Sequence, residues 1–416
     1  MQDPITGTLA DRLERLTQAV GETERSLHGE LLLDPTLIQR PWIAIASSRL
    51  GHQAVLHQEV CQYVSRCMKE CRERDAVLLI AAGSAIDPWA TRAAALFQVP
   101  AIRISVGQDN NEKDLAELQI RSSIDQPLNR DEVLIALADF VDAVYVRRNG
   151  TIANCLGKRI HDRADASTRV AITSLPNCAG KTLIQKGAVG WWTTSHKPER
   201  DQGTLPQSAI TDESTAWMHT DDQWLIHCTR GCTGPWPGQT ENQYRDELLL
   251  GGQIASRRPL DTLIRILRSG RLVAGAIASA RQWPVVCFSA APLTQLLISR
   301  RYRPHLKRWD YEPFGIAISR SAAQSIGIQQ VIYGKAADRA QISESDQFRF
   351  HPAGKTYDWT AEREWRSPVD VDLSKLGDRH VRVFVANAAD AIEIQSHCPW
   401  RISVLSEALR SGPDAV

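Results

Sequence analysis

Two glutamates that could act together stand near the end of the chain, in the run Glu362-Arg363-Glu364-Trp365-Arg366. If this run is a strand, its period of two places both carboxylates and Arg366 on one face and Trp365 on the other. Neighbouring carboxylates repel each other unless a cation or a developing positive charge lies opposite them. The run therefore suits chemistry that passes through an oxocarbenium-like cation. The alternative is a solvated surface patch whose charges neutralise one another.

Earlier strands of the same half carry further polar candidates. The segment 223–232 is expected to be a strand with His227 and Thr229 on one face and Arg230 nearby, and Ser289 ends the apolar strand 284–292. Taken singly, the histidine could be a hydrogen-bonded structural residue and the serine a strand-end hydroxyl. An amphipathic helix is expected at 259–272 with Gly270 as its C-cap.

The order of His227, Ser289 and Glu364 resembles the ADP-ribosyltransferase-like fold, in which these positions line one NAD cleft. Residues 224–368 also look like a poorly characterised bacterial family with abortive-infection members. The chain departs from the pattern because it lacks a clean Arg-Ser-Glu set and carries Cys-Phe-Ser-Ala where Ser-Thr-Ser is usual.

The resemblance implies NAD as cofactor and a role for each polar residue. Glu364 would hold the ribose and its cation, and Glu362 would activate the acceptor. Which glutamate has which role stays open. The remaining cofactor-binding residues would be His227 and Thr229 at the adenosine-side ribose, Arg230 at a phosphate, and Ser289.

The first half alternates short apolar runs with helical segments after an amphipathic start at residues 5–40. Such alternation predicts a parallel sheet covered by helices on both faces. The expected strands are 42–46, 76–83, 100–106, 141–147 and 169–174.

Small and polar residues cluster where three of these strands end. In open α/β sheets this edge binds ligands beside helix N-termini that can hold a phosphate. The alternative is that the turns need such residues for their geometry. The candidate ligand-binding residues are Ser47, Ser48, Arg49, Gly83, Ser84, Asp87, Gly150 and Thr151.

Residues 40–193 resemble the Rossmann-like domain of the DNA-processing protein A group, within the SLOG superfamily. The family's Gly-Ser-Arg is here Ser47-Ser48-Arg49, its Gly-Gly-x-x-Gly-Ile-Asp is 82–87, its Arg-Asn-Arg is Asn129-Arg130-Asp131, and its Ser-Gly-Ser/Thr turn is 149–151. These departures imply a pocket for a nucleotide or sugar-nucleotide in place of single-stranded DNA. The run 179–182 is not a P-loop, because Leu175 stands where that motif needs glycine.

A polar stretch at 194–216 marks the expected domain boundary. We predict a SLOG-like domain with N-terminal helices at 1–195, a linker at 196–220 and an ADP-ribosyltransferase-like domain at 221–416. The predicted fold class is α/β: a Rossmann-like parallel sheet followed by an α+β domain.

A basic cluster in the second half could bind a nucleic-acid acceptor, since its cations are interleaved with Tyr302 and Trp309. The alternative is a solvated helix face. The candidate nucleic-acid-binding residues are Arg300, Arg301, Arg303, Lys307 and Arg308.

Composition sets outer limits. The 416 residues carry a net charge of +1, which provides no global field for a polyanion. We expect no signal peptide and no membrane span, because no apolar run reaches about 18 residues. Nine irregularly placed cysteines favour a reducing cytoplasm, and Cys228 and Cys232 lack a second ligand pair, so no metal site is expected.

These observations together predict a cytoplasmic bacterial stress or anti-phage protein. Its first domain would bind a nucleotide-derived ligand and support homo-oligomers, and its second would transfer ADP-ribose from NAD or hydrolyse NAD. One alternative is a single-stranded DNA-binding protein with a non-catalytic C-terminal domain. Another is a metal-dependent nuclease that uses Glu362 and Glu364 as ligands.

Overall fold

The chain divides into two compact units. The computed structural model describes residues 7–28, 34–51, 54–107, 116–122, 127–163, 166–173, 178–192, 215–275, 283–303, 308–353 and 359–405. The first unit comprises Met1–His196 and Thr233–Ser256, and the second comprises Lys197–Cys232 and Arg257–Val416. Most of the predicted linker, residues 196–214, lies outside the described residues.

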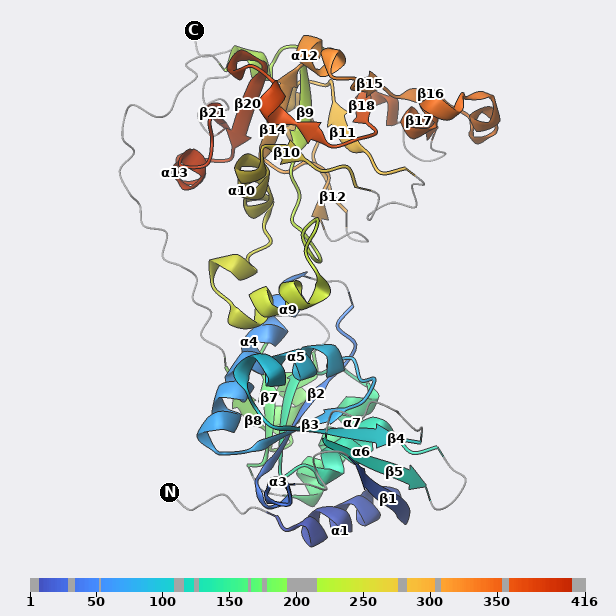
Figure 1. Cartoon of the computed structure of the whole chain (residues 1–416), viewed down its shortest axis with the longest axis vertical. Helices are drawn as coiled ribbons and strands as arrows, with labels where there is room; N and C mark the ends of the chain where they lie inside the picture. Colours follow the sequence, from blue (N-terminus) through green and yellow to red (C-terminus); the bar gives the residue numbers. More distant parts are fainter. Residues whose placement is uncertain are drawn as a thin grey trace. The chain divides into compact units, whose positions relative to one another are not determined.

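The first unit is built on an eight-stranded sheet with the order β1-β5-β4-β3-β2-β6-β7-β8 (Figure 1). Every neighbouring pair is parallel except β1 with β5. The predicted parallel sheet is confirmed. The strands are β1 (Thr23–His28), β2 (Trp42–Ser47), β3 (Val77–Ala81), β4 (Ala101–Val106), β5 (Ala116–Ser122), β6 (Phe140–Tyr145), β7 (Thr168–Ala171) and β8 (Val189–Trp191).

Helices cover both faces of this sheet. As a result, successive side chains of the central strands are buried on opposite sides. Trp42 and Ala44 belong to one apolar core, whereas Ile43 and Ile45 belong to the other. The helices of the first unit's main segment are α1 (Leu9–Val20), α3 (Thr36–Gln39), α4 (Ala54–Glu73), α5 (Asp87–Phe97), α6 (Arg130–Leu137), α7 (Thr151–Asp162) and α8 (Gly180–Gln185).

Residues 5–40 differ from the predicted helices in one respect. The helices α1 and α3 form, but β1 lies between them as a strand. It pairs antiparallel with β5 over six residues, from Thr23 opposite Ser122 to His28 opposite Glu117. Pairing with a strand that is distant in sequence decides the conformation of this half-polar segment.

The segment Thr233–Ser256 packs within the first unit, although the sequence placed it in the second domain. Its helix α9 (Glu241–Leu250) adds Tyr244, Leu248 and Leu249 to the core beneath α4 and α5. The Tyr244 hydroxyl lies 3.1 Å from Nδ1 of His57 on α4. Asp246 accepts two hydrogen bonds from the Arg92 guanidinium on α5, at 2.5 and 2.6 Å. Tertiary contacts of this kind are not encoded in local periodicity.

The second unit is an α+β structure around a seven-stranded sheet, which is antiparallel except between its last two strands. In spatial order the strands are β15 (Gln329–Gln330), β18 (Glu364–Ser367), β11 (Val286–Ser289), β9 (Trp224–Cys228), β14 (Gly315–Ser319), β20 (Val381–Val385) and β21 (Arg401–Val404). Its helices are α10 (Pro259–Ser269), α11 (Leu293–Ile298), α12 (Arg320–Ser325) and α13 (Ala388–Gln395), with 3-10 turns at Ala216–Met218, Ala336–Gln341, Glu344–Arg349, Trp359–Glu362, Leu373–Lys375 and Asp378–His380.

Three two-stranded sheets complete the second unit: β10 (Arg271–Leu272) with β19 (Val371–Asp372), β12 (Tyr302–Arg303) with β13 (Arg308–Trp309), and β16 (Ile332–Gly334) with β17 (Phe350–Pro352). The predicted helix at 259–272 is confirmed as α10. Its C-cap Gly270 adopts the left-handed conformation with φ 64°.

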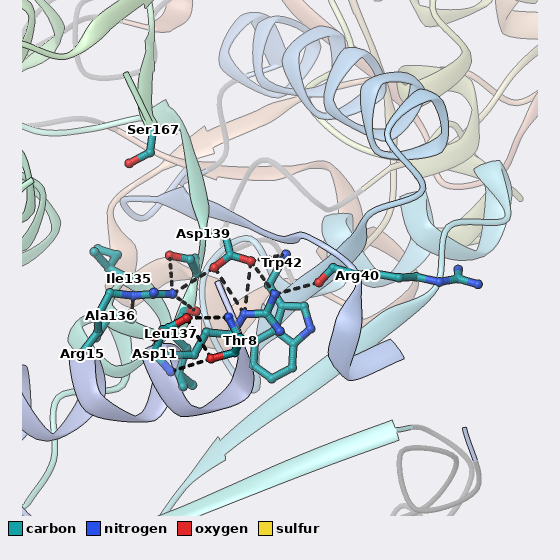
Figure 2. A network of polar contacts seen from close by, with 12 residues as sticks. Thr8, Asp11, Arg15, Arg40, Trp42, Ile135, Ala136, Leu137, Asp139 and Ser167 are labelled. Carbon is teal, nitrogen blue, oxygen red and sulfur yellow. Dashed lines mark hydrogen bonds and ion pairs between the residues drawn. The ribbon is translucent and has the colours of Figure 1, made fainter. Parts of the chain in front are cut away.

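A buried ion pair fixes the N-terminal helix to the sheet. Arg12 on α1 is fully buried and donates to both carboxylate oxygens of Asp139, with its Nη2 at 2.6 Å from Oδ2. Arg15 approaches the same carboxylate at 3.0 Å, and the Trp42 amide donates to it at 2.9 Å (Figure 2). One carboxylate therefore joins α1, the start of β2 and the start of β6.

Replacing Arg12 by methionine should destabilise the first unit by about 3 kcal/mol, because Asp139 stays buried after losing its main cation. Amide exchange measured by mass spectrometry should show faster opening of peptides from β2 and β6. Arg25→Met, which removes an exposed arginine of β1, serves as the control. Equal exchange in the two variants would contradict the importance of this ion pair.

Candidate functional site

The edge of the first sheet at the carboxyl ends of β2 and β6 is a topological switch point. These strands are neighbours, but the chain continues from β2 to β3 and β4 on one side and from β6 to β7 and β8 on the other. Ligands of open α/β sheets bind in the crevice outside such a point. The predicted ligand-binding residues 47–49 and 150–151 flank it.

Backbone contacts bring the two loops together. The Ser48 amide donates to the Tyr145 carbonyl oxygen at 2.7 Å, and the Arg147 amide donates to the Ser48 hydroxyl at 3.1 Å. The Arg147 guanidinium reaches the carbonyl oxygen of Arg49 at 2.6 Å. Ser48 therefore shapes the loop pair, and the exposed Arg49 and Arg147 side chains lie at the same edge.

Among the described residues, no side chain caps the start of α7, the helix that follows β6. Gly150 is the N-cap of α7 and provides no side-chain acceptor, and Thr151 at the first helical position is exposed. Asn149 has φ 56°, a left-handed conformation that turns the chain into the helix. The first amides of α7 are thus available to an anion.

Three arginines belong to the two loops at this edge of the sheet. Arg49, Arg147 and Arg148 are exposed, and Arg148 donates to the Cys178 carbonyl oxygen at 3.3 Å. Within the described part of the chain, none of the three has a carboxylate partner. The switch point therefore presents three guanidinium charges and a helix N-terminus to solvent.

In the turn after β3, the predicted ligand-binding residues form hydrogen bonds with one another and with Arg103. Asp87 accepts hydrogen bonds from the Gly83 amide at 2.7 Å and from Arg103 at 3.1 Å. The Ser84 hydroxyl accepts from the Asp87 amide at 3.1 Å, and Gly83 has φ 68°. These residues shape the turn and start α5. Ser47 is likewise buried, with its hydroxyl on the Ser48 carbonyl oxygen.

The second unit places three predicted strands side by side, in the order β18-β11-β9. Ser289 lies opposite Glu364 and Ile226, so these three residues share one face of the sheet. His227 therefore points to the other face, where its ring lies 5.6 Å from Phe288. The expectation that His227, Ser289 and Glu364 line one cleft is corrected by this register.

His227 and Thr229 are occupied by backbone groups. Nδ1 of His227 donates to the Cys287 carbonyl oxygen at 2.9 Å, and burial of the ring lowers its pKa. The Thr229 hydroxyl is buried and contacts the carbonyl oxygens of Pro259 and Phe314, at 2.9 and 3.2 Å. Both side chains hold strand β9 in place.

Glu364 is neutralised by its neighbour on the strand. Arg366 donates to both carboxylate oxygens, from Nε at 3.0 Å and from Nη2 at 2.9 Å. The Glu364 side chain is 10% exposed and the Arg366 side chain is 3% exposed. Such a buried bidentate pair is a fixed structural unit, because the arginine already neutralises the carboxylate charge.

Glu362 does not lie on the strand, contrary to the predicted alternation. It ends the 3-10 turn Trp359–Glu362, and Arg363 follows with φ 45° before β18 begins at Glu364. The Ser289 hydroxyl donates to the Glu362 carbonyl oxygen at 2.6 Å, and Arg363 pairs with Asp221 at 2.5 Å. These contacts hold the left-handed residue and aim the two glutamates differently.

The Glu362 carboxyl lies among charged and phenolic groups. Burial raises its pKa above the ordinary glutamate value, and the nearby charges of Glu364 and Asp310 raise it further. A hydrogen bond from the Tyr311 hydroxyl and the charge of Arg230 act in the opposite direction. Glu362 is therefore a carboxyl group able to exchange a proton, beside a carboxylate that stays paired.

Two tyrosines near these glutamates were not predicted. Tyr311 bonds Glu362, and the Tyr333 hydroxyl accepts a hydrogen bond from the Glu364 amide at 3.1 Å. Tyr311 lies in an irregular segment, whereas Tyr333 lies in β16, which pairs with β17 outside the main sheet. The Val331 amide donates to the Glu364 carbonyl oxygen at 2.9 Å, and this contact brings the segment that carries Tyr333 to the start of β18.

The basic cluster forms part of a hairpin rather than a helix. Arg303 pairs with Asp310 at 2.8 Å, and Arg300 lies 3.6 Å from Glu312 and 4.3 Å from the Trp309 ring. Arg301 is exposed. Lys307 and the side chain of Arg308 lie outside the description. Two of the predicted cations are therefore neutralised within the hairpin, which weakens a nucleic-acid patch.

No group of three or more His, Cys, Asp or Glu side chains is arranged to hold a metal ion in the described part. Among the described helices, none has the length and apolarity needed to cross a bilayer.

Comparisons with known proteins give partial structural likenesses. No family model and no curated protein matches the chain. DNA processing protein A (DprA) from Streptococcus pneumoniae matches at 17% identity and a TM-score of 0.30, over 40% of this chain and 62% of that one. The same protein from Helicobacter pylori, described for its single-stranded DNA binding, matches at 17% identity and a TM-score of 0.30. The match covers 40% of this chain and 80% of that one.

The molybdenum cofactor carrier protein MCP from Chlamydomonas reinhardtii matches at 11% identity and a TM-score of 0.28, over 37% of this chain and 89% of that one. At these values the likenesses add nothing to what the strand order of the first unit establishes.

Replacing Glu362 by glutamine should stabilise the second unit at neutral pH. The folded state binds the Glu362 proton more tightly than the unfolded chain, so ionisation costs folding free energy as pH rises above about 4.3. The variant's advantage should therefore grow from about pH 4 and level off above the raised pKa. Denaturant unfolding across this range tests it, with the exposed Glu344→Gln as control. An advantage independent of pH would contradict the assignment.

Proposed function

We propose that the first unit binds a phosphate-bearing, nucleotide-derived ligand at the switch point between β2 and β6. Two observations support this: Arg49, Arg147 and Arg148 are exposed in the two loops at this edge, and no side-chain hydrogen bond caps the start of α7 there. Guanidinium groups bind phosphate oxygens in bidentate fashion, and a helix N-terminus favours the same negative charge. A nucleotide or sugar-nucleotide is small enough to be held by these two loops alone.

Single-stranded DNA is the alternative ligand for the same charges. A nucleotide pocket and a DNA groove differ in how binding responds to salt, because each phosphate neutralised on DNA releases a counterion. Titrations with ADP and with an oligonucleotide over a salt series distinguish them. Stronger oligonucleotide binding with a steep salt dependence would favour the DNA-binding alternative.

Arg148→Ala should weaken ADP binding about tenfold, since a charge-assisted hydrogen bond to phosphate is lost. Arg49→Ala should behave similarly. Isothermal titration calorimetry on the full chain measures both, with Arg25→Ala as a matched control on a distant strand of the same unit. Unchanged affinity in both test variants would exclude this edge as the ADP site.

We further propose that the second unit uses NAD, by ADP-ribosyl transfer or hydrolysis, with Glu362 as the working carboxyl. The proposal is supported by the difference between the two glutamates. Glu364 is bound by Arg366 on both oxygens, whereas Glu362 has a raised pKa and a hydrogen bond from the Tyr311 hydroxyl. A carboxylate near the ribose stabilises positive charge that develops mainly in the transition state. Arg230 is exposed and close enough to affect Glu362, so it could take a phosphate.

This revises the roles expected from the resemblance. Glu364 becomes the residue that positions the strand, and Glu362 the one that acts on the substrate. His227 and Thr229 leave the cofactor site because their polar atoms are used within the sheet. The proposed cytoplasmic role in stress or anti-phage defence, and the assembly of copies through the first unit, remain predictions.

Glu362→Gln should lower nicotinamide release from NAD by about 10²–10³-fold, the usual effect of removing a transition-state electrostatic partner. His227→Gln should keep the rate, because the imidazole lies on the opposite face of the sheet. Chromatographic detection of nicotinamide compares the variants. No turnover by the unaltered protein with any acceptor would reject the NAD proposal, and loss of rate in His227→Gln would reject the revised site.

A further inference from the structure

A small two-stranded flap brings a phenol to the start of β18, where its hydroxyl contacts the Glu364 amide. The flap consists of β16 and β17, which pair in parallel outside the main sheet. Nη1 of Arg366 donates to the carbonyl oxygens of Phe348 and Phe350, at 3.1 and 3.3 Å. Because the same guanidinium holds Glu364, one side chain fixes the flap and the strand together.

Tyr333 is the flap residue that meets the glutamates. Its hydroxyl oxygen accepts the Glu364 amide proton at 3.1 Å, and its ring lies 5.9 Å from the ring of His351. Within the described part of the chain, the hydroxyl proton of Tyr333 has no acceptor. The half-buried side chain therefore keeps one hydrogen-bond donor for a molecule that is not the protein.

Tyr311 provides an internal comparison. Its hydroxyl proton is given to the Glu362 carboxyl, whereas the Tyr333 proton is not committed. The charges of Glu362 and Glu364 both act on Tyr333, which places its hydroxyl within reach of their fields. The site thus offers a carboxylate acceptor at Glu362 and a phenolic donor at Tyr333.

A vicinal diol fits this combination. One hydroxyl of a ribose can donate to the Glu362 carboxylate while the other accepts from Tyr333. An inorganic cation would use the carboxylate alone, and a free phosphate would use the phenol while being repelled by the glutamates. The donor and acceptor pair therefore selects a sugar diol over a simple ion.

We propose that Tyr333 binds the substrate of the second unit by donating its hydroxyl proton to a ribose hydroxyl oxygen, beside the Glu362 carboxyl. This inference rests on the proposed use of NAD. It names the nicotinamide-side ribose as the part of the substrate that the second unit recognises.

Tyr333→Phe removes only the hydroxyl and should raise the KM for NAD about tenfold, the upper range for one net hydrogen bond. The pH profile of the reaction should not move, because Glu362 keeps Tyr311. Tyr311→Phe is the matched control: it removes a hydrogen bond that lowers the pKa of Glu362, so its pH profile should shift to higher pH. Melting temperatures check that both variants fold.

An NAD analogue lacking the 2′-hydroxyl of the nicotinamide ribose tests the contact itself. The unaltered protein should lose about tenfold in kcat/KM with the analogue, and Tyr333→Phe should lose little more. Equal KM values for Tyr333→Phe and the unaltered protein, or independent and additive losses, would overturn the inference. If NAD is not turned over, calorimetric binding of ADP-ribose decides, and equal affinity in the two proteins would also overturn it.

Discussion

The placement of the proposed ligand edge of the first unit depends on one buried carboxylate at the opposite end of the sheet. Asp139 accepts the Trp42 amide proton, and its own amide donates to the Trp42 carbonyl oxygen at 2.8 Å (Figure 2). These bonds fix the register of β2 against β6, which runs in step to Ala46 and then shifts at Ser47. The irregularity turns the ends of the strands so that Ser48 meets the Arg147 amide. A charge at the amino ends therefore sets the geometry of the carboxyl ends.

The two units use buried arginines in the same way. Arg12 binds Asp139 together with the carbonyl oxygens of Ile38 and Arg40, at 2.5 and 2.7 Å. Arg366 binds Glu364 together with two carbonyl oxygens of the flap. Desolvating each ion pair is costly, and replacing both of its members by apolar side chains can leave the stability unchanged. An apolar side chain, however, could not satisfy the carbonyl groups that each arginine binds besides its carboxylate.

Apolar runs made the central strands of the first unit predictable, because strands buried on both faces contain little else. The edge strand β1 and its partner β5 were missed since half of their side chains are polar and only their mutual pairing defines them. His227 was wrongly expected on the same face of the sheet as Ser289 and Glu364, for a related reason. The sequence shows the alternation along β9, but the pairing of Ser289 with Ile226 decides which face is shared, and a shift of one residue reverses it. Likewise, the position of α9 in the sequence assigns it to the second domain, yet its buried side chains pack against α4 and α5 of the first unit.

The left-handed conformation of Arg363 is what makes the two glutamates chemically different. A regular strand through residue 362 would place both carboxylates beside Arg366, where they would compete for a single guanidinium and repel each other. The break at φ 45° removes Glu362 from that face, and the Ser289 hydroxyl and Asp221 hold the break in place. Glu364 then keeps the cation, and Glu362 is left in partly buried surroundings that raise its pKa. A single backbone angle thus gives two neighbouring glutamates different surroundings: an arginine holds the carboxylate of Glu364, and burial raises the pKa of Glu362.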